Sequence, residues 1–155
     1  MRSSTSWQWA CVLAAGTYLS GCAAAPPQVE YFREPGSQLP FSTAVRVGDV
    51  VYLSGQIGNN ADGSIPQEFA DQARVTMDNI ASAAKQAGVG MGSIFKCLVM
   101  IQDMSRWGEF NKVYVAYFDT DRLPARSAFG ASGLALGAQL EVECLAVAPA
   151  RRARR

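Results

Sequence analysis

The 155-residue sequence contains no histidine. Without histidine, the chain cannot form the Ser-His or Cys-His pairs that activate a nucleophile, and it cannot bind a metal through imidazole nitrogens. Cysteine is also scarce, and the four cysteines show no spacing typical of a metal site. The apolar stretch at residues 7–18 is too short for a membrane-spanning helix, which needs roughly 20 apolar residues. The side chains that remain for catalysis or ligand binding are therefore carboxylates, amides and arginine, and we expect no metal site.

The net charge of +1 hides an uneven distribution of basic residues. Four arginines lie in residues 151–155, whereas residues 22–150 carry nine Lys and Arg against thirteen Asp and Glu, a net charge of −4. Binding to a phosphate backbone needs clustered cations, so the acidic body argues against nucleic acid as a partner. We interpret residues 151–155 as a solvated tail, with a weak contact to anionic lipids as the alternative.

The N-terminal residues resemble a bacterial lipoprotein signal peptide. A basic start at Arg2 precedes an apolar stretch at 7–18, as in a signal-peptide core. The stretch ends in Leu19-Ser20-Gly21-Cys22, which resembles a lipobox. The resemblance implies cleavage before Cys22, lipidation of that cysteine and a periplasmic protein anchored to a membrane, by analogy the outer membrane. The alternative is a soluble secreted protein that is cut near residues 23–25.

On this interpretation the chain has four parts. They are a signal peptide (1–21), a lipidated tether (22–38), one domain (39–150) and a basic tail (151–155). Small residues and prolines dominate the tether, which is typical of an extended linker that does not pack. Tyr31-Phe32 is the exception, because these two rings can dock on the domain. The domain has the length of a single folding unit.

Two cysteines, Cys97 and Cys144, remain once Cys11 is removed with the signal peptide and Cys22 is lipidated. An oxidising periplasm would allow them to form a disulfide. Each lies within an apolar run, however, and buried free cysteines behave as small hydrophobic residues. We therefore expect two buried free thiols.

Hydrophobic patterning predicts the element order ββ-α-β-α-ββ. Residues 45–47 and 50–53 are predicted to form a hairpin around the two-residue turn Gly48-Asp49. Apolar residues recur every three or four positions from about 66 to 87, which predicts a helix that ends at Gly88. The other predicted elements are a strand at 95–102 that is apolar enough for burial on both faces, a helix at 105–118, and strands at 125–131 and 138–147. This order predicts an α+β fold with two helices on one face of a sheet.

The last strand is predicted to carry a row of carboxylates. Side chains alternate along a strand, so Glu141 and Glu143 point to the same face, which requires water, a partner subunit or a pocket. Arg126 follows a proline at the start of the preceding strand, and its forked guanidinium can bind both oxygens of a carboxylate. From the local sequence alone, a surface arginine is the favoured interpretation of Arg126, and Glu141 could equally be a solvated strand residue.

Six segments over residues 39–149 resemble, in register, the reactive-intermediate deaminase family (Rid, or YjgF-like). In chain order they are LPFS (39–42), VGDVVYLSGQI (47–57), Gln72 with MDNI (77–80), Phe110-Asn111 with Tyr114 and Phe118, PARS (124–127) and GAQLEVE (137–143). The resemblance implies a chorismate-mutase-like fold with a mixed sheet, assembled as a homotrimer with pockets between subunits. It also implies hydrolysis of 2-imino acids, such as 2-iminobutanoate or 2-iminopropanoate, to 2-oxo acids and ammonium without a cofactor.

The resemblance assigns roles to individual residues of this chain. Arg126 would bind the substrate carboxylate, and Glu141 would orient or activate the attacking water. Asn111, Ser54 and Gly55 would complete the pocket, glycine allowing the backbone to approach a ligand closely. The alternatives are a helix-surface amide for Asn111 and a plain strand end for Ser54-Gly55.

Two positions depart from the family pattern. The pocket tyrosine is Phe41 here, which keeps the ring and loses the hydroxyl, although Phe41 would still line the pocket. The cysteine often found two residues after the arginine is Ala128, which excludes a thiol nucleophile at that position. These departures favour, as an alternative, a non-enzymatic trimer that binds small carboxylates or acts as a holdase. RNA cleavage is a second alternative, opposed by the acidic body and the missing histidine.

Overall fold

The computed structural model describes residues 26–150. The predictions for the signal peptide, for lipidation of Cys22 and for the basic tail fall on residues 1–25 and 151–155, outside the described residues. The structure therefore bears on the domain and on the last part of the predicted tether.

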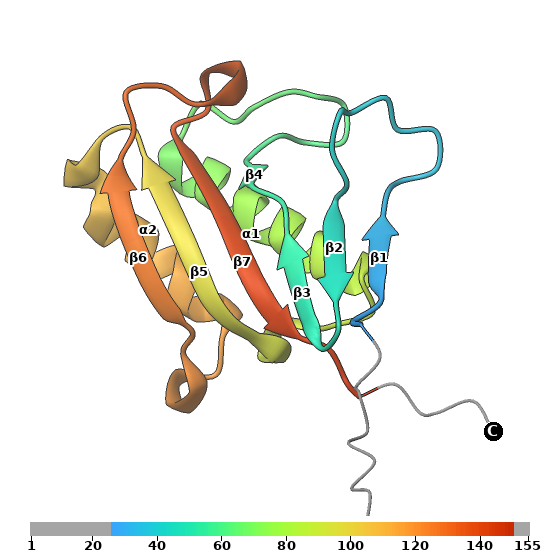
Figure 1. The fold of residues 1–155 in the computed structure, drawn as a ribbon. Coiled ribbons are helices and arrows are strands. Elements are labelled where there is room, and N and C mark those ends of the chain that lie inside the picture. Colours follow the sequence, from blue (N-terminus) through green and yellow to red (C-terminus); the bar gives the residue numbers. More distant parts are fainter. Residues whose placement is uncertain (1–25, 151–155) are drawn as a thin grey trace, which may run out of the picture.

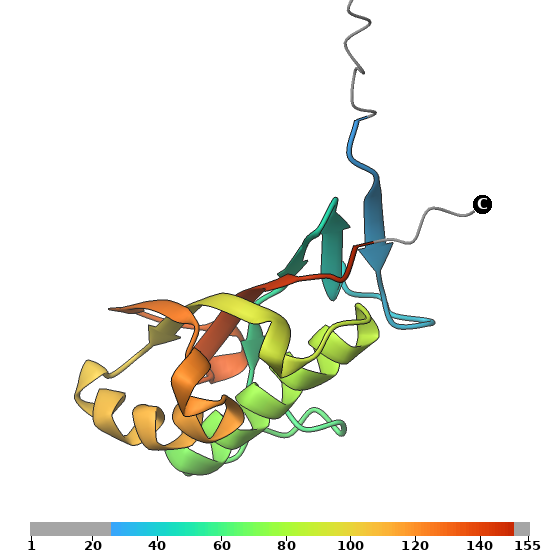
Figure 2. The ribbon, with the colours of Figure 1, turned by 90° about the horizontal axis from the view of Figure 1, so that it is seen from below.

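A mixed sheet forms one layer of the domain and two helices form the other (Figures 1 and 2). The strand order is β1-β2-β3-β7-β5-β6, and β4 pairs with β7. The strands are β1 (Val29–Phe32), β2 (Ala44–Val47), β3 (Val50–Leu53), β4 (Gln56–Ile57), β5 (Ile94–Ile101), β6 (Ala125–Gly130) and β7 (Leu140–Val147). Only β5 and β6 run parallel, and parallel neighbours require a crossover, which the second helix provides.

Helices α1 (Phe69–Gln86) and α2 (Trp107–Tyr114) cover the same face of the sheet (Figure 2). The apolar stripe of α1 is buried against the sheet, as its periodicity predicted. Gly88 follows with a φ of +76°, the left-handed conformation that favours glycine after a helix. The α2 segment is shorter than predicted, because residues 104–106 and 115–117 form 3-10 turns at its two ends. The prediction of two helices on one face is confirmed.

The opposite face of the sheet is open in the single chain. In β5, Cys97, Val99 and Ile101 are fully buried under the helices, whereas Leu98 and Met100 are only partly buried on the other side. The predicted burial of this strand on both faces is therefore not met within one chain, because the helices form a layer on one side only. Other apolar side chains on this open face include Tyr52, Phe129 and Leu145.

The end of the predicted tether is part of the sheet. Val29–Phe32 forms β1, which pairs antiparallel with β2 at the sheet edge. Phe32 is partly buried and packs against the core, whereas Tyr31 is exposed. Docking of this aromatic pair is thus confirmed for one ring, and the prediction of an unpacked tether is wrong for Val29–Phe32.

Cys97 and Cys144 form a disulfide, so the expectation of two free thiols is wrong. The two residues lie directly opposite each other in the antiparallel pair β5 and β7, with their Cα atoms 4.1 Å apart. Both are buried beneath the helices. The apolar runs around them were interpreted correctly as buried strands. Whether the two cysteines lie opposite each other depends on the register between β5 and β7, which the sequence of either strand does not show.

Candidate carboxylate-binding site

Arg126 lies on the edge strand β6 with its side chain on the helix-covered face. Its Nη2 donates a hydrogen bond of 2.7 Å to Oδ1 of Asn111 on α2. The guanidinium carbon lies 4.3 Å from the centroid of the Trp107 ring and 4.4 Å from that of Tyr114. Burial lowers the pKa of Arg126, yet an arginine remains charged at neutral pH. The structure therefore joins two of the predicted site residues, Arg126 and Asn111, in one cationic group.

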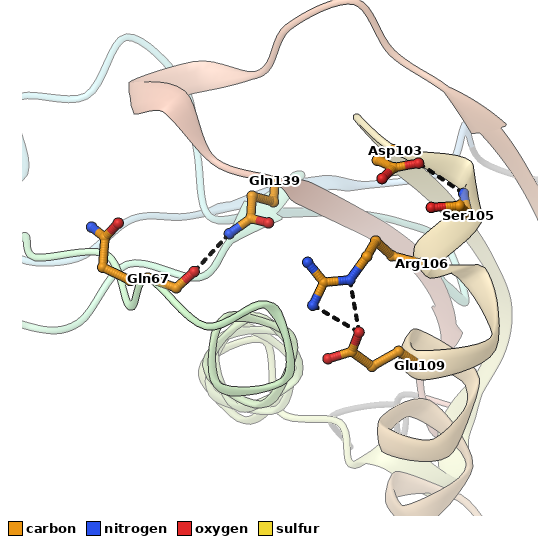
Figure 3. A network of polar contacts seen from close by, with 6 residues as sticks. All are labelled: Gln67, Asp103, Ser105, Arg106, Glu109 and Gln139. Atoms are coloured by element: carbon orange, nitrogen blue, oxygen red, sulfur yellow. Dashed lines mark hydrogen bonds and ion pairs between the residues drawn. The ribbon is translucent and has the colours of Figure 1, made fainter.

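A polar network fixes the start of the helix that carries Asn111 (Figure 3). The Asp103 carboxylate accepts a 2.9 Å hydrogen bond from the backbone N–H of Ser105, which caps the 3-10 turn before α2. Arg106 pairs with Glu109 at 2.7 Å, and its guanidinium also lies over the ring of Phe69 in α1, 4.5 Å from the centroid. Hydrogen bonding to Arg106 lowers the pKa of Glu109. The contact with Phe69 joins the start of α2 to α1.

Glu141 lies on β7 with its side chain on the open face of the sheet. It approaches Gly55 so closely that a Cβ atom at this glycine would overlap its Oε1, so a larger residue here would displace the Glu141 carboxylate. Burial, together with the negative charge of Glu143, raises the pKa of Glu141. Ser54 donates a 2.7 Å hydrogen bond from Oγ to the carbonyl oxygen of Ser42. A pocket of about 560 Å³ beside this group includes Ser54, Gly55 and Glu143 in its wall.

The two positions that depart from the family pattern lie in different parts of the chain. Phe41 lies in the loop before β2 and directly precedes Ser42, whose carbonyl oxygen accepts the hydrogen bond from the Ser54 hydroxyl. Its ring is 48% exposed and leaves room for a ligand or a neighbouring chain. Ala128 lies two residues after Arg126 on the same face of β6 and packs against the core.

Arg126 and Glu141 lie on opposite faces of the sheet. Arg126 is opposite Cys97 of β5, which faces the helices, whereas Glu141 is opposite Met100, which faces away from them. One chain therefore forms two half-sites: an arginine half-site around Arg126 and a glutamate half-site around Glu141. Because β6 is the edge strand, the arginine half-site can be approached from beside the sheet.

The aromatic residues around the guanidinium include one that sequence reasoning missed. Trp107 was not recognised, and Tyr114 was named among the residues that match the family pattern but without a role beside Arg126. The signal was present, because residues 107, 111 and 114 are spaced by four and three positions and so share one helix face with Asn111.

Two further findings concern the part of the chain that the structure describes. Among residues 26–150, no three or more Cys, Asp or Glu side chains gather in a way that could hold a metal ion. Neither of the two described helices is long and apolar enough to cross a bilayer.

Residues 32–148 match the sequence model of the family described as endoribonuclease L-PSP. The chain is 32% identical to the 2-iminobutanoate/2-iminopropanoate deaminase of Mus musculus over 117 residues, which cover 74% of this chain and 86% of the mouse protein. It is 33% identical to the Bos taurus protein of the same name over 117 residues, covering 74% of this chain and 85% of the bovine protein.

Solved structures from E. coli share the fold. The structure of TdcF with bound serine matches with a TM-score of 0.68 and 34% identity, covering 78% of this chain and 98% of TdcF. The YjgF gene product matches with a TM-score of 0.70 and 31% identity, covering 79% of this chain and 99% of that chain. The mixed sheet with two helices on one face is thus the chorismate-mutase-like fold of these proteins, and the chain belongs to the Rid/YjgF (L-PSP) family.

Proposed function

We propose that this protein is a Rid-type deaminase that hydrolyses 2-imino acids to 2-oxo acids and ammonium. The observation that carries the proposal is the Arg126–Asn111 pair at the sheet edge. The bond to Asn111 uses one of the five N–H donors of the guanidinium. Adjacent donors of a guanidinium match both oxygens of a carboxylate, which is the group that every 2-imino acid presents. Mammalian relatives at 32–33% identity are named 2-iminobutanoate/2-iminopropanoate deaminases, which supports this assignment.

Glu141 would act on the water molecule in this reaction. Water adds to the imine carbon, the carbon–nitrogen bond breaks, and ammonia leaves with the protons of the imine and of water. A glutamate whose pKa is raised by burial is a stronger base than an exposed one and can accept the proton of the attacking water. Imines hydrolyse without a catalyst, so orienting the water and the carboxylate gives sufficient acceleration.

The proposed active site requires a second copy of the chain. The arginine and glutamate half-sites lie on opposite faces of one sheet, so a single chain cannot present both to one small substrate. The open face carries apolar side chains such as Tyr52, which is 48% exposed, and Phe129, which is 47% exposed. Large apolar patches of this kind mark protein interfaces. A homotrimer in which β6 of one chain meets the glutamate half-site of its neighbour satisfies both observations.

Two variants test the proposed roles. Arg126→Ala should abolish both 2-oxobutanoate binding and imine hydrolysis, because losing one partner of a buried charge pair costs about 2–5 kcal/mol. Glu141→Gln should retain the fold and the binding but lose hydrolysis, because an amide cannot accept the proton of water. The assay is hydrolysis of freshly generated 2-iminobutanoate, with Glu34→Gln as a control that removes an exposed loop carboxylate.

The second candidate function is a non-enzymatic trimer that binds small carboxylates or acts as a holdase. The phenylalanine at position 41 and the alanine at position 128 favour it, since both replace reactive groups of the family pattern. If the wild-type protein fails to accelerate imine hydrolysis while 2-oxobutanoate still binds in an Arg126-dependent way, this second function replaces the first.

We also propose that the mature protein is anchored to a membrane through lipidated Cys22, on the periplasmic side. The Cys97–Cys144 disulfide supports this location, because disulfides persist in oxidising compartments. Val29, the first residue of β1, follows Cys22 by seven residues, a reach of about 25 Å when extended. The domain would therefore lie near the bilayer surface.

A further inference from the structure

The guanidinium of Arg126 lies in an aromatic environment formed by α2. Its central carbon is 4.3 Å from the ring centroid of Trp107, 4.4 Å from that of Tyr114 and 5.8 Å from that of Phe110. Tyr114 and Phe110 are buried, whereas Trp107 is partly exposed at the start of the helix. We call Trp107 and Tyr114 the aromatic pair.

The two members of the aromatic pair both contact the guanidinium. Trp107 and Tyr114 are seven residues apart on one helix face, which corresponds to about 10.5 Å along the helix axis. The guanidinium carbon lies over both rings at nearly equal distances. Asn111 lies between the two aromatic residues in the sequence and accepts the hydrogen bond from Nη2.

This arrangement restricts the guanidinium in two ways. The electron-rich faces of the rings attract a cation, most strongly for tryptophan. The hydrogen bond to Asn111 then fixes the rotation of the planar group. An arginine that is already ordered loses less conformational entropy when a ligand binds. The unused N–H donors are therefore held in one direction before the ligand arrives.

We propose that Trp107 and Tyr114 are positioning residues that hold Arg126 ready for a bidentate contact with a ligand carboxylate. The inference rests on the proposed function only in taking a 2-oxo or 2-imino carboxylate as the ligand. It applies equally to an enzyme and to a non-enzymatic carboxylate-binding protein. Trp107 is the member that can be changed with least damage to the core, because it is only partly buried.

The same residue supplies a direct measurement. The other tryptophans, Trp7 and Trp9, precede residue 22, so a chain that begins at residue 26 contains Trp107 alone. The described domain aligns with 99% of the solved YjgF chain, so this shorter chain retains what such a protein needs to fold. Its intrinsic fluorescence should change when 2-oxobutanoate binds next to Arg126, and Arg126→Lys should remove that change because lysine lacks the fork.

The decisive variants are Trp107→Leu and Trp107→Phe, assayed by calorimetry with 2-oxobutanoate and by imine hydrolysis. Trp107→Leu should raise Kd and KM about ten-fold, within the range of a partly desolvated cation–π contact, and change kcat by less than about two-fold. Trp107→Phe should recover most of the affinity, since it restores an aromatic face. Tyr117→Leu is the matched control. It removes an aromatic ring that follows α2 directly, and the hydroxyl of this ring contacts Asp78 of α1 and not Arg126.

Three results would overturn the inference. One is equal affinity for 2-oxobutanoate in Trp107→Leu and wild type. Another is a Trp107→Phe variant that binds no better than Trp107→Leu at an unchanged melting temperature. The third is a wild-type protein that does not bind 2-oxobutanoate. Failure of the deaminase proposal gives a different result. In that case wild type binds 2-oxobutanoate in a way that depends on Arg126 and Trp107, but it does not accelerate imine hydrolysis.

Discussion

At the residue scale, the two groups proposed for catalysis are both disfavoured in their charged forms. Burial lowers the pKa of Arg126, and burial with the charge of Glu143 raises the pKa of Glu141. Such departures from the ordinary pKa values are typical of functional sites, where burial and neighbouring charges adjust the groups that bind or react with a ligand.

The charge of Glu143 leads to a prediction for the pH dependence. Hydrolysis needs ionised Glu141, so kcat/KM should fall as the pH drops through the raised pKa of this group. Glu143→Gln removes one cause of the raised pKa and should move this acid limb to lower pH. A pH–rate profile of the variant beside wild type and Glu34→Gln measures the shift. A limb that stays in place or moves upward would contradict the assigned base.

Position 41 gives a second prediction at this scale. Phe41→Tyr restores the hydroxyl of the family pattern on a ring that is 48% exposed, so it should not disturb the core. If that hydroxyl limits the present protein, kcat/KM for 2-iminobutanoate should rise about two- to ten-fold, the value of one added hydrogen bond. Steady-state kinetics at an unchanged melting temperature check this, and an unaltered rate would show that the phenol is dispensable.

At the scale of the elements, the central strands place the disulfide and the arginine half-site in one row. Cys144 on β7 lies opposite Cys97 on β5, and Cys97 lies opposite Arg126 on β6. All three side chains face the helices, because directly opposite residues share a face of a sheet. The disulfide thus joins β7 to β5, the strand that pairs with the edge strand and its arginine.

Removing the disulfide should destabilise the domain. The Cys97→Ala, Cys144→Ala double variant should lose about 2–4 kcal/mol of unfolding free energy, because the bond joins residues 47 apart and limits the unfolded chain. Urea unfolding of the purified domain measures this loss. Reductant should lower the melting temperature of wild type towards that of the double variant, while leaving the double variant unchanged. Wild type that is indifferent to reductant after unfolding and refolding would mean that the thiols are free.

At the scale of the whole molecule, the open sheet face and the separated half-sites both point to an assembly. The two half-sites are presented in different directions by the same chain. In a closed ring of copies, each chain can place its arginine half-site against the glutamate half-site of the next chain. Both half-sites of every chain are then occupied. The shared active site therefore depends on the proposed trimer.

Mixing inactive variants tests the shared site. In mixed trimers of Arg126→Ala and Glu141→Gln chains, some interfaces combine an intact arginine from one chain with an intact glutamate from the next. In a closed ring every mixed trimer has one such interface out of three, so a sample freed of homotrimers should recover about a third of the wild-type activity. Co-expressed variants with two affinity tags provide the sample, and light scattering gives its mass. Mixed trimers without activity would show that Arg126 and Glu141 do not act at a common interface.

The proposed membrane anchor gives a prediction that involves residues outside the described domain. Cys22→Ala should convert a protein that sediments with membranes and needs detergent for extraction into a soluble or unprocessed one, because the acyl chains hold it on the bilayer. Fractionation with labelled palmitate measures both properties. A wild-type protein recovered as free soluble protein without label would remove the lipoprotein proposal.

The sequence by itself determined the two helices and five of the seven strands of the described domain in their order, and it missed the short strands β1 and β4. The hairpin at Gly48-Asp49, the helix that ends at Gly88 and the alternation of Glu141 with Val142 are all present, because turn chemistry and side-chain periodicity are local properties. Ordered matches along the chain also identified the family before the fold was known.

Only the tertiary structure decided how these elements face one another. Alternation shows that neighbours within a strand point to opposite faces, but it does not relate the face of Arg126 on β6 to that of Glu141 on β7. The register between strands, set by packing of residues far apart in the chain, placed these groups on opposite faces and joined Cys97 to Cys144. Trp107 came next to Arg126 for the same reason, because a helix face acquires its partner only when it packs on the sheet.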